Sequence, residues 1–286
     1  MVVDQLLAEG IKSLQNRQYT NPQLEVRLIL SRLMGVDKSY LYAYGDKELP
    51  EDLVRRFRDL ILKRTEGYPL QYLLGTQEFM GMDLEVSEGV LIPRGDTEIL
   101  VEYLLDHIDE SIGDREFTVL DIGIGSGAIS LAIAKFCPNS KVYGVDLYDE
   151  PLQVANRNKE NLGLHNVEYY RGDLFSPFEG DEWSGYFDII VSNPPYIPEG
   201  ERGGLQVEVG RYEPETSLFA GEDGLDFYRR ITAQAKRYIK DNGLLAYEIG
   251  HDQGKDVADL LRREGFNEVQ VIDDFENRNR VVTGRA

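Results

Sequence analysis

The chain of 286 residues is 42% hydrophobic, enough for one large or two modest domains, and no apolar run approaches the roughly 20 residues that span a bilayer. Its formal net charge of −20 disfavours a general affinity for nucleic acids, because like charges repel. The single cysteine excludes an internal disulfide and, with a start that lacks signal-peptide features, predicts a cytoplasmic protein.

Residues 1–66 have apolar side chains at helical spacing. Asn21 followed by Pro22 predicts a helix start, because Asn can cap a first turn and Pro fits within it. A second helix is predicted from about Glu51 to Arg64, and the side chains expected to turn inward are Leu53, Phe57, Leu60 and Ile61. Its basic residues indicate a solvated face or a surface for a partner: Arg55, Arg56, Arg58, Lys63 and Arg64.

Residues 75–92 show short apolar alternation interrupted by Gly81 and Gly89. This pattern predicts a β-hairpin that joins two domains. Asp96 is then expected to be the N-cap of a helix that runs to about His107.

From Phe117 onward, short apolar runs alternate with amphipathic segments. Strands are predicted at residues 117–122, 141–146, 166–171, 186–192, 243–249, 268–273 and 280–284, and helices at 126–136, 150–161, 224–240 and 252–264. This alternation predicts an α/β fold with a parallel sheet covered by helices on both faces. Residues 197–223 form a long stretch rich in Gly, Glu and Pro, and such stretches are usually functional or disordered.

The first of these strands leads into a glycine turn, whose residues are Gly123, Ile124, Gly125, Ser126 and Gly127. Glycine lets the backbone approach a ligand closely at the carboxyl end of a strand. The spacing is Gly-x-Gly-x-Gly, which differs from the Gly-x-Gly-x-x-Gly of dinucleotide binders and favours a cofactor without a pyrophosphate. An ordinary strand-to-helix turn is the alternative.

Carboxylates also follow the next two strands. Asp146 ends the second strand, 19 residues beyond Gly127, where it is placed to accept hydrogen bonds from both ribose hydroxyls of a nucleoside. Asp173 follows the third strand and is placed to accept from the exocyclic amine of adenine. The pattern favours a nucleoside pocket over two surface carboxylates.

The most informative residues are Asn193, Pro194, Pro195 and Tyr196, directly after the fourth strand. An amide or aryl NH2 is a poor nucleophile because its lone pair is delocalised. The Asn193 side-chain oxygen and the Pro194 carbonyl can hold both hydrogens of such a group and aim its nitrogen at a methyl group. The prolines stiffen the turn, and Tyr196 offers an aromatic face to a planar substrate. A rigid turn without chemistry is the alternative.

With these residues placed, the chain resembles the HemK/PrmC family of protein-(glutamine-N5) methyltransferases, which modify peptide-chain release factors. The resemblance covers nearly the whole chain and is carried by residues 69–75, Phe79 and residues 90–94, 123–127, 193–196, 212–230 and 280–285. Asn-Pro-Pro-Tyr alone is shared with adenine-N6 DNA methyltransferases. The segment around Ile92, Pro93 and Arg94, together with the helical N-terminus, is much more specific.

The resemblance implies a seven-stranded, mostly parallel, doubly wound sheet of the SAM-dependent methyltransferase fold, with a small helical N-terminal domain joined by a β-hairpin. It implies a substrate-recognition domain at residues 1–68, a hairpin linker at 69–95 and a methyltransferase domain at 96–286. It further implies S-adenosyl-L-methionine as the cofactor, S-adenosyl-L-homocysteine as the product, and the glutamine of the release factors' Gly-Gly-Gln loop as the methyl acceptor.

The resemblance also assigns roles to residues. Cofactor contacts are expected from Gly123, Ile124, Gly125, Ser126, Gly127, Asp146, Asp173, Leu174 and Asn193. The glutamine is expected to be held by Asn193, Pro194, Pro195 and Tyr196, of which Asn193, Pro194 and Tyr196 serve catalysis. Gly95 stands where the family usually has Pro, and Leu174 where relatives often have Trp. No metal is expected, since methyl transfer from a sulfonium needs only alignment and a dry site.

Three alternatives stay open. A ribosomal-protein glutamine methyltransferase would use the same chemistry on a different partner. An adenine-N6 nucleic-acid methyltransferase would act on a similar flat NH2 group, but residues 96–286 hold 19 basic and 37 acidic side chains, which disfavours direct nucleic-acid binding. A non-catalytic scaffold would not need an intact Asn-Pro-Pro-Tyr.

Overall fold

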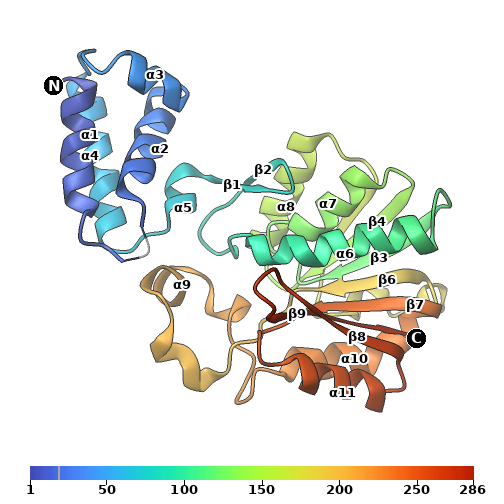
Figure 1. Ribbon diagram of the computed structural model, residues 1–286. Helices are drawn as coiled ribbons and strands as arrows, with labels where there is room; N and C mark the ends of the chain where they lie inside the picture. Colours follow the sequence, from blue (N-terminus) through green and yellow to red (C-terminus); the bar gives the residue numbers. More distant parts are fainter. Residues whose placement is uncertain (19) are drawn as a thin grey trace. The chain divides into compact units, whose positions relative to one another are not determined.

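The computed structural model describes residues 1–18 and 20–286, and the chain divides into two compact units (Figure 1). The first comprises Met1–Thr76 and Gln206–Tyr212, and the second comprises Gln77–Leu205 and Glu213–Ala286. A short segment from the second half of the sequence therefore belongs with the N-terminal helices. No local pattern in the sequence indicates this.

The first unit is built of helices around an apolar core. Its helices are α1 (Val3–Leu14), α2 (Pro22–Met34), α3 (Lys38–Ala43), α4 (Glu51–Thr65), α5 (Leu70–Leu74) and α9 (Val207–Tyr212). The predicted start of α2 is confirmed, since the Asn21 side chain accepts a hydrogen bond of 3.2 Å from a backbone N–H of the first turn. The predicted α4 is confirmed too, with Phe57 and Ile61 buried and Leu53 and Leu60 packed against the same core.

One basic side chain of α4 does not lie on the predicted solvated or partner-binding face. Arg64 is only 2% exposed, because its guanidinium enters a buried ion cluster. Its Nε donates to Glu25 of α2 at 2.6 Å, and its Nη1 lies 2.9 Å from Glu208 of α9. Arg17 donates to the same Glu208 carboxylate at 2.9 Å. The prediction is wrong for Arg64, because helical spacing does not reveal which basic residue meets a buried acid.

The predicted hairpin lies where the second unit begins, and a long helix follows it. β1 (Thr76–Phe79) and β2 (Met82–Glu85) are joined by Met80 and Gly81, whose φ angles of 49° and 69° suit a tight hairpin turn. Its strands are shorter than the predicted span of residues 75–92. The N-cap of α6 (Gly95–Ser111) is Arg94, so the prediction that Asp96 caps this helix is wrong. Asp96 lies in the first turn, where the helix dipole still favours a carboxylate.

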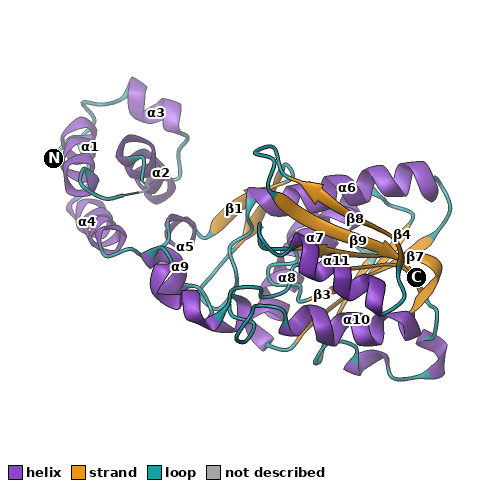
Figure 2. Cartoon of the chain, turned by 60° about the horizontal axis from the view of Figure 1, so that its bottom comes forward, coloured by secondary structure: helices purple, strands orange, loops and turns teal. Residues whose placement is uncertain are grey.

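A seven-stranded sheet forms the centre of the second unit (Figure 1; Figure 2). Its strands are β3 (Phe117–Ile122), β4 (Ser140–Asp146), β5 (Val167–Arg171), β6 (Phe187–Ser192), β7 (Ile239–Glu248), β8 (Asn267–Asp273) and β9 (Asn279–Arg285). They lie in the order β5-β4-β3-β6-β7-β9-β8, and β9 runs antiparallel to the other strands. The predicted mostly parallel sheet is confirmed.

Helices cover both faces of the sheet, as predicted. α6, α7 (Ala128–Phe136) and α8 (Asp149–Leu162) pack on one face, and α10 (Asp226–Tyr238) and α11 (Gly254–Arg263) pack on the other. Every residue of β6 is buried, as expected for a parallel strand covered on both sides. The chain winds outward in opposite directions from β3 and β6, and ligands of such sheets bind at the carboxyl ends of strands at this switch point.

The long stretch after β6 is folded into short helical turns. They are η3 (Glu199–Gly204), α9 and η4 (Glu215–Ser217), and an isolated bridge between Ile197 and Phe219 closes the stretch at its base. Among the described residues, no helix combines the length and apolarity that crossing a membrane requires.

Candidate active site

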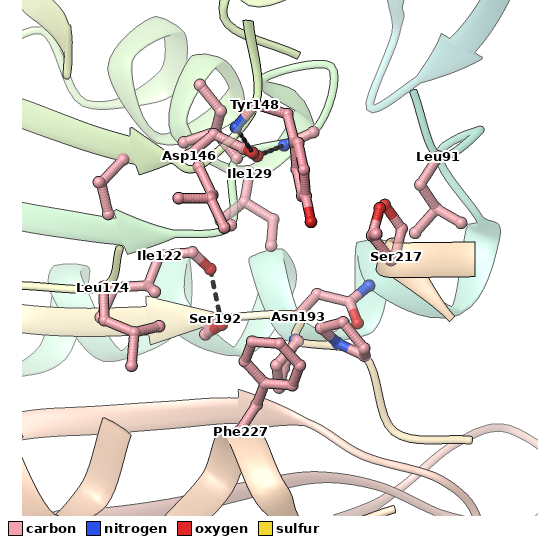
Figure 3. Close-up of a pocket in the computed structure, with 18 of the residues that line it drawn as sticks. Leu91, Ile122, Ile129, Asp146, Tyr148, Leu174, Ser192, Asn193, Ser217 and Phe227 are labelled. Carbon is pink, nitrogen blue, oxygen red and sulfur yellow. Dashed lines mark hydrogen bonds between the residues drawn. The ribbon is translucent and has the colours of Figure 1, made fainter. Parts of the chain in front are cut away.

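A pocket lies at the carboxyl ends of β3, β4 and β6, within the second unit (Figure 3). It brings together ten of the predicted site residues: Gly123, Ile124, Gly125, Ser126, Asp146, Asp173, Leu174, Asn193, Pro194 and Pro195. Two further predicted site residues, Gly127 and Tyr196, are not part of its lining. Residues from four successive strand ends thus converge on one cavity.

The glycine turn after β3 contributes backbone rather than side chains to the pocket. Gly123, Gly125 and Gly127 have φ angles of 78°, 54° and 83°, in the left-handed region that favours glycine. A Cβ added at Gly123 or Gly125 would meet no atom within 4 Å, so these positions leave open space for a ligand. A Cβ at Gly127 would lie 2.7 Å from the Tyr169 hydroxyl. Gly127 therefore serves the packing of the turn against β5.

Asp146 ends β4 and faces the glycine turn. Its Oδ2 accepts from the Gly125 backbone N–H at 3.2 Å, and its Oδ1 accepts from that of Tyr148 at 3.1 Å (Figure 3). Burial raises the pKa of this carboxyl, and the backbone hydrogen bonds oppose the rise. Each carboxylate oxygen retains a second lone pair, so the side chain is held in place and can still accept from hydroxyls in the pocket.

Asp173 and Leu174 follow β5 and form a second wall. Asp173 Oδ2 accepts from Arg230 Nη2 at 2.6 Å in a half-exposed pair. Leu174 is buried and has a φ of 53°, which is uncommon for a residue with a Cβ and here occurs at a pocket wall. Its side chain and that of Ile122 give this end of the pocket an apolar surface (Figure 3).

Asn193, Pro194 and Pro195 directly follow the carboxyl end of β6. Asn193 is half-buried, and its Nδ2 donates to the Thr97 hydroxyl of α6 at 3.2 Å. The preceding Ser192 hydroxyl donates to the Ile122 carbonyl at 2.6 Å, which ties β6 to β3 just before the turn. Asn193 is therefore fixed from two sides, by its own side chain and by the strand that precedes it.

Tyr196 lies apart from the other residues of its motif. Its ring packs against the apolar core on the α10 and α11 face, and burial raises its pKa well above the usual value. Its backbone carbonyl accepts from Gln253 Nε2 at 2.9 Å. The aromatic role predicted for Tyr196 stays a prediction, while its backbone anchors the chain as it leaves the pocket.

Several pocket residues are not among the predicted site residues. They are Thr97 from α6, Thr216 and Ser217 from η4, Phe227 and Ile231 from α10, and Arg94, which pairs with the buried Glu213. A buried carboxyl, Glu248, also ends β7 close to Asn193. Arg94, Glu213, Thr216, Ser217 and Phe227 lie in the two segments that carry the family resemblance, residues 90–94 and 212–230, and this resemblance is the one signal for them. Within residues 1–18 and 20–286, no cluster of His, Cys, Asp or Glu could hold a metal ion.

Comparisons with protein-family models and with a solved structure match this chain to methyltransferases. Residues 114–268 match a methyltransferase domain model, and residues 5–75 match the model of the PrmC N-terminal domain. A methyltransferase from Pyrococcus furiosus has the same fold, with a TM-score of 0.52 and 18% identity over 81% of this chain and 97% of that one. The fold and the pocket thus define an S-adenosylmethionine-dependent methyltransferase domain.

Curated relatives narrow this class to one family. The chain is 42% identical to a release factor glutamine methyltransferase of Geobacter sulfurreducens, over 93% of this chain and 90% of the relative. It is 41% identical to one of Clostridium acetobutylicum, over 90% and 88%. The chain belongs to the release factor glutamine methyltransferase family.

Proposed function

We propose that this protein transfers a methyl group from S-adenosyl-L-methionine to the side-chain amide nitrogen of the glutamine in the Gly-Gly-Gln loop of peptide-chain release factors. The observation that carries the proposal is the Asn193 and Pro194 pair on the pocket wall, in a chain more than 40% identical to relatives named for this activity. With a release factor as its substrate, we expect the protein to act in the cytoplasm.

The pocket residues fit the cofactor. Asp146 retains acceptor capacity for the two ribose hydroxyls, and the open backbone at Gly123 and Gly125 admits the close approach of a ligand. Leu174 and Ile122 suit an adenine ring, and the second oxygen of Asp173 suits its exocyclic amine. When bound, the cofactor supplies an electrophilic methyl group on a sulfonium and leaves as S-adenosyl-L-homocysteine.

The turn after β6 then acts on the methyl acceptor. Because Asn193 Nδ2 donates to Thr97, its Oδ1 is left to accept one N–H of the substrate amide. The Pro194 carbonyl is expected to accept the other, and the paired prolines keep the two acceptors at a fixed separation. Held in this way, the amide nitrogen is aligned with the methyl group, and alignment supplies much of the rate enhancement.

The helical first unit is proposed to recognise the protein partner. The division of labour assigns recognition to residues 1–68, linkage to 69–95 and methyl transfer to 96–286. The pocket is lined by residues of the second unit alone, so the chemistry does not require a side chain from the first.

The experiment that tests the proposal follows labelled methyl from the cofactor to candidate acceptors. A release factor should be labelled, and replacing its loop glutamine by glutamate should abolish labelling, because no amide NH2 remains for Asn193 and Pro194 to hold. Asn193→Ala enzyme is the matched control and should label poorly. Ribosomal proteins, DNA and RNA should stay unlabelled at low salt, where attraction to phosphate is strongest. Label on any of these, with an unlabelled release factor, would overturn the proposal.

A further inference from the structure

Close to Asn193, β7 ends in a carboxyl whose burial needs an explanation. Glu248 is 1% exposed, and its Oε2 has no hydrogen-bond partner in the part of the chain that the structure describes. A buried polar atom without a partner is unfavourable, and more so when it carries charge. An apolar side chain here would avoid this penalty, so packing alone does not account for a carboxyl.

Two polar side chains lie against this carboxyl. Ser192 of β6 pairs with Tyr247 of β7, so Asn193 and Glu248 follow at neighbouring positions, and hydrogen bonding by Thr97 and Asn193 lowers the pKa of Glu248. Asn193 Nδ2 also donates to Thr97 Oγ1 at 3.2 Å. We call these three residues the Glu248 cluster. Thr97 and Asn193 line the pocket, whereas Glu248 does not. Glu248 can therefore act on a bound substrate through these two neighbours.

We propose that Glu248 is a positioning residue that fixes the orientation of the Asn193 amide. A side-chain amide has two orientations of nearly equal shape, in which Oδ1 and Nδ2 exchange places. An ionised carboxylate only accepts hydrogen bonds, so it selects the orientation in which Nδ2 faces the cluster. Oδ1 then faces the methyl acceptor. The inference rests on the proposed function and adds a residue that serves it.

The protonation state of Glu248 decides whether this selection operates. Burial raises its pKa to about 7, although hydrogen bonds from Thr97 and Asn193 oppose the rise. A protonated carboxyl becomes a donor and can bond to Asn193 Oδ1, which stabilises the reversed amide. Turnover should therefore fall as the pH falls through about 7.

Other charged and titratable groups face Glu248 from the elements around it. They are Asp96 of α6, Arg280 of β9, Tyr228 of α10 and Tyr196 after β6. Arg280 Nη2 is engaged by Asp96 at 3.0 Å and by Asp274 at 3.4 Å, so it lowers the pKa of Glu248 without pairing with it. Burial raises the pKa of both tyrosines far above 7, so they stay neutral where Glu248 titrates.

The test measures kcat and KM against pH for the full-length enzyme with labelled cofactor and a release factor. Glu248→Gln keeps the shape of the side chain but presents either a donor or an acceptor to Asn193. It should lower kcat at pH 8 by up to about 100-fold, as a misplaced reacting group can. The KM for the cofactor should stay near the wild-type value. The decrease of kcat as the pH falls below about 7 should disappear. Glu264→Gln, exposed beyond α11, is the matched control and should keep the wild-type profile.

Thr97 gives a second test that does not depend on how Glu248→Gln folds. Thr97→Val removes the hydroxyl that accepts from Asn193 and should lower kcat much more than Thr97→Ser does. An unchanged kcat and an unchanged dependence of kcat on pH in Glu248→Gln, or equal kcat in the two Thr97 variants, would overturn the positioning role. A wild-type enzyme that leaves the release factor unlabelled would instead overturn the proposed function.

Discussion

The two units each bury a carboxylate, and the two carboxylates are satisfied to different degrees. In the first unit, Glu25 accepts from Arg64 through both oxygens, at 2.6 and 3.3 Å, and from the Asn21 backbone. In the second unit, Glu248 is buried more deeply, at 1% exposed against 6% for Glu25, yet one of its oxygens has no partner among the described residues. No residue of the ion cluster around Glu25 lines the pocket, whereas Thr97 and Asn193 of the Glu248 cluster do. Full pairing indicates a structural role, whereas an unmet oxygen beside a pocket indicates chemistry.

Asp121 extends this comparison. It is fully buried in β3 next to the glycine turn, its Oδ2 accepts from the Ser130 backbone at 3.1 Å, and its Oδ1 has no partner in the described chain. Burial raises its pKa to about 7, as it does for Glu248. Asp121 thus belongs to a strand that ends at the pocket, and Glu248 ends the strand next to β6, which also ends there. Perturbed pKa values usually gather at such sites.

Breaking the buried ion pair between Arg64 and Glu25 should have the largest effect on stability. Arg64→Ala leaves Glu25 buried without its counter-ion, and the free energy of unfolding should fall by about 3–5 kcal/mol. Chemical denaturation monitored by circular dichroism measures this. Arg58→Ala, on an exposed face of the same helix, is the control and should change stability little. Similar losses of stability in both variants would contradict a structural role for the buried Arg64–Glu25 pair.

Removing the amide that the Glu248 cluster orients should have the next largest effect, on rate rather than stability. Asn193→Ala should lower kcat by about 10²–10³-fold with little change in cofactor affinity, as the loss of one preorganised polar contact does. Steady-state kinetics with a release factor measure both quantities. If Glu248 acts only through Asn193, adding Glu248→Gln to Asn193→Ala should cost nothing further. Additive losses would show that Glu248 has a separate role.

Asp146 is a third kind of carboxylate, held by backbone N–H groups but with acceptor capacity to spare. At about 100 times the dissociation constant, the cofactor should stabilise the wild-type protein by about 2.7 kcal/mol. Asp146→Ala should remove most of this stabilisation, which thermal unfolding with and without cofactor measures. Asp149→Ala, exposed in the first turn of α8, should keep it. An undiminished shift in Asp146→Ala would show that Asp146 does not hold the ribose.

Much of the fold could be predicted from the sequence because its signals are local. Buried parallel strands such as β3 and β6 are continuous apolar runs that end at a glycine turn or at Asn193, so their positions are predicted to within one residue. The pocket residues on these strand ends follow directly, since parallel strands bring their carboxyl ends to one edge of the sheet.

The remaining site residues could not be predicted, because their role depends on contacts between distant segments. In the sequence, Thr97 looks like an ordinary residue in the first turn of α6, yet its hydroxyl accepts a hydrogen bond from Asn193, which is 96 positions away. Glu248 reads as the polar end of an apolar strand and differs from other strand ends only in what surrounds it. Helical spacing likewise predicts an exposed face for Arg64, because its partner Glu208 comes from the distant helix α9.

The most direct test of the account compares wild type with Glu248→Gln for stability at pH 5 and pH 8. The carboxyl of Glu248 ordinarily titrates at 4.5, and burial raises its pKa to about 7 in the folded protein. Between these values the native state binds more protons than the unfolded state, so stability is fully present below pH 4.5 and is lost as the pH rises to 7. The glutamine variant cannot ionise, and wild type should therefore lose about 2–3 kcal/mol relative to it between the two pH values.

At pH 8, wild type should be less stable relative to the Glu248→Gln variant than at pH 5, but its turnover should be faster than that of the variant. A buried charge that is kept for catalysis predicts this combination of lower stability and faster turnover. A stability difference that is the same at pH 5 and pH 8, with equal turnover, would contradict the claim that Glu248 is retained to orient Asn193.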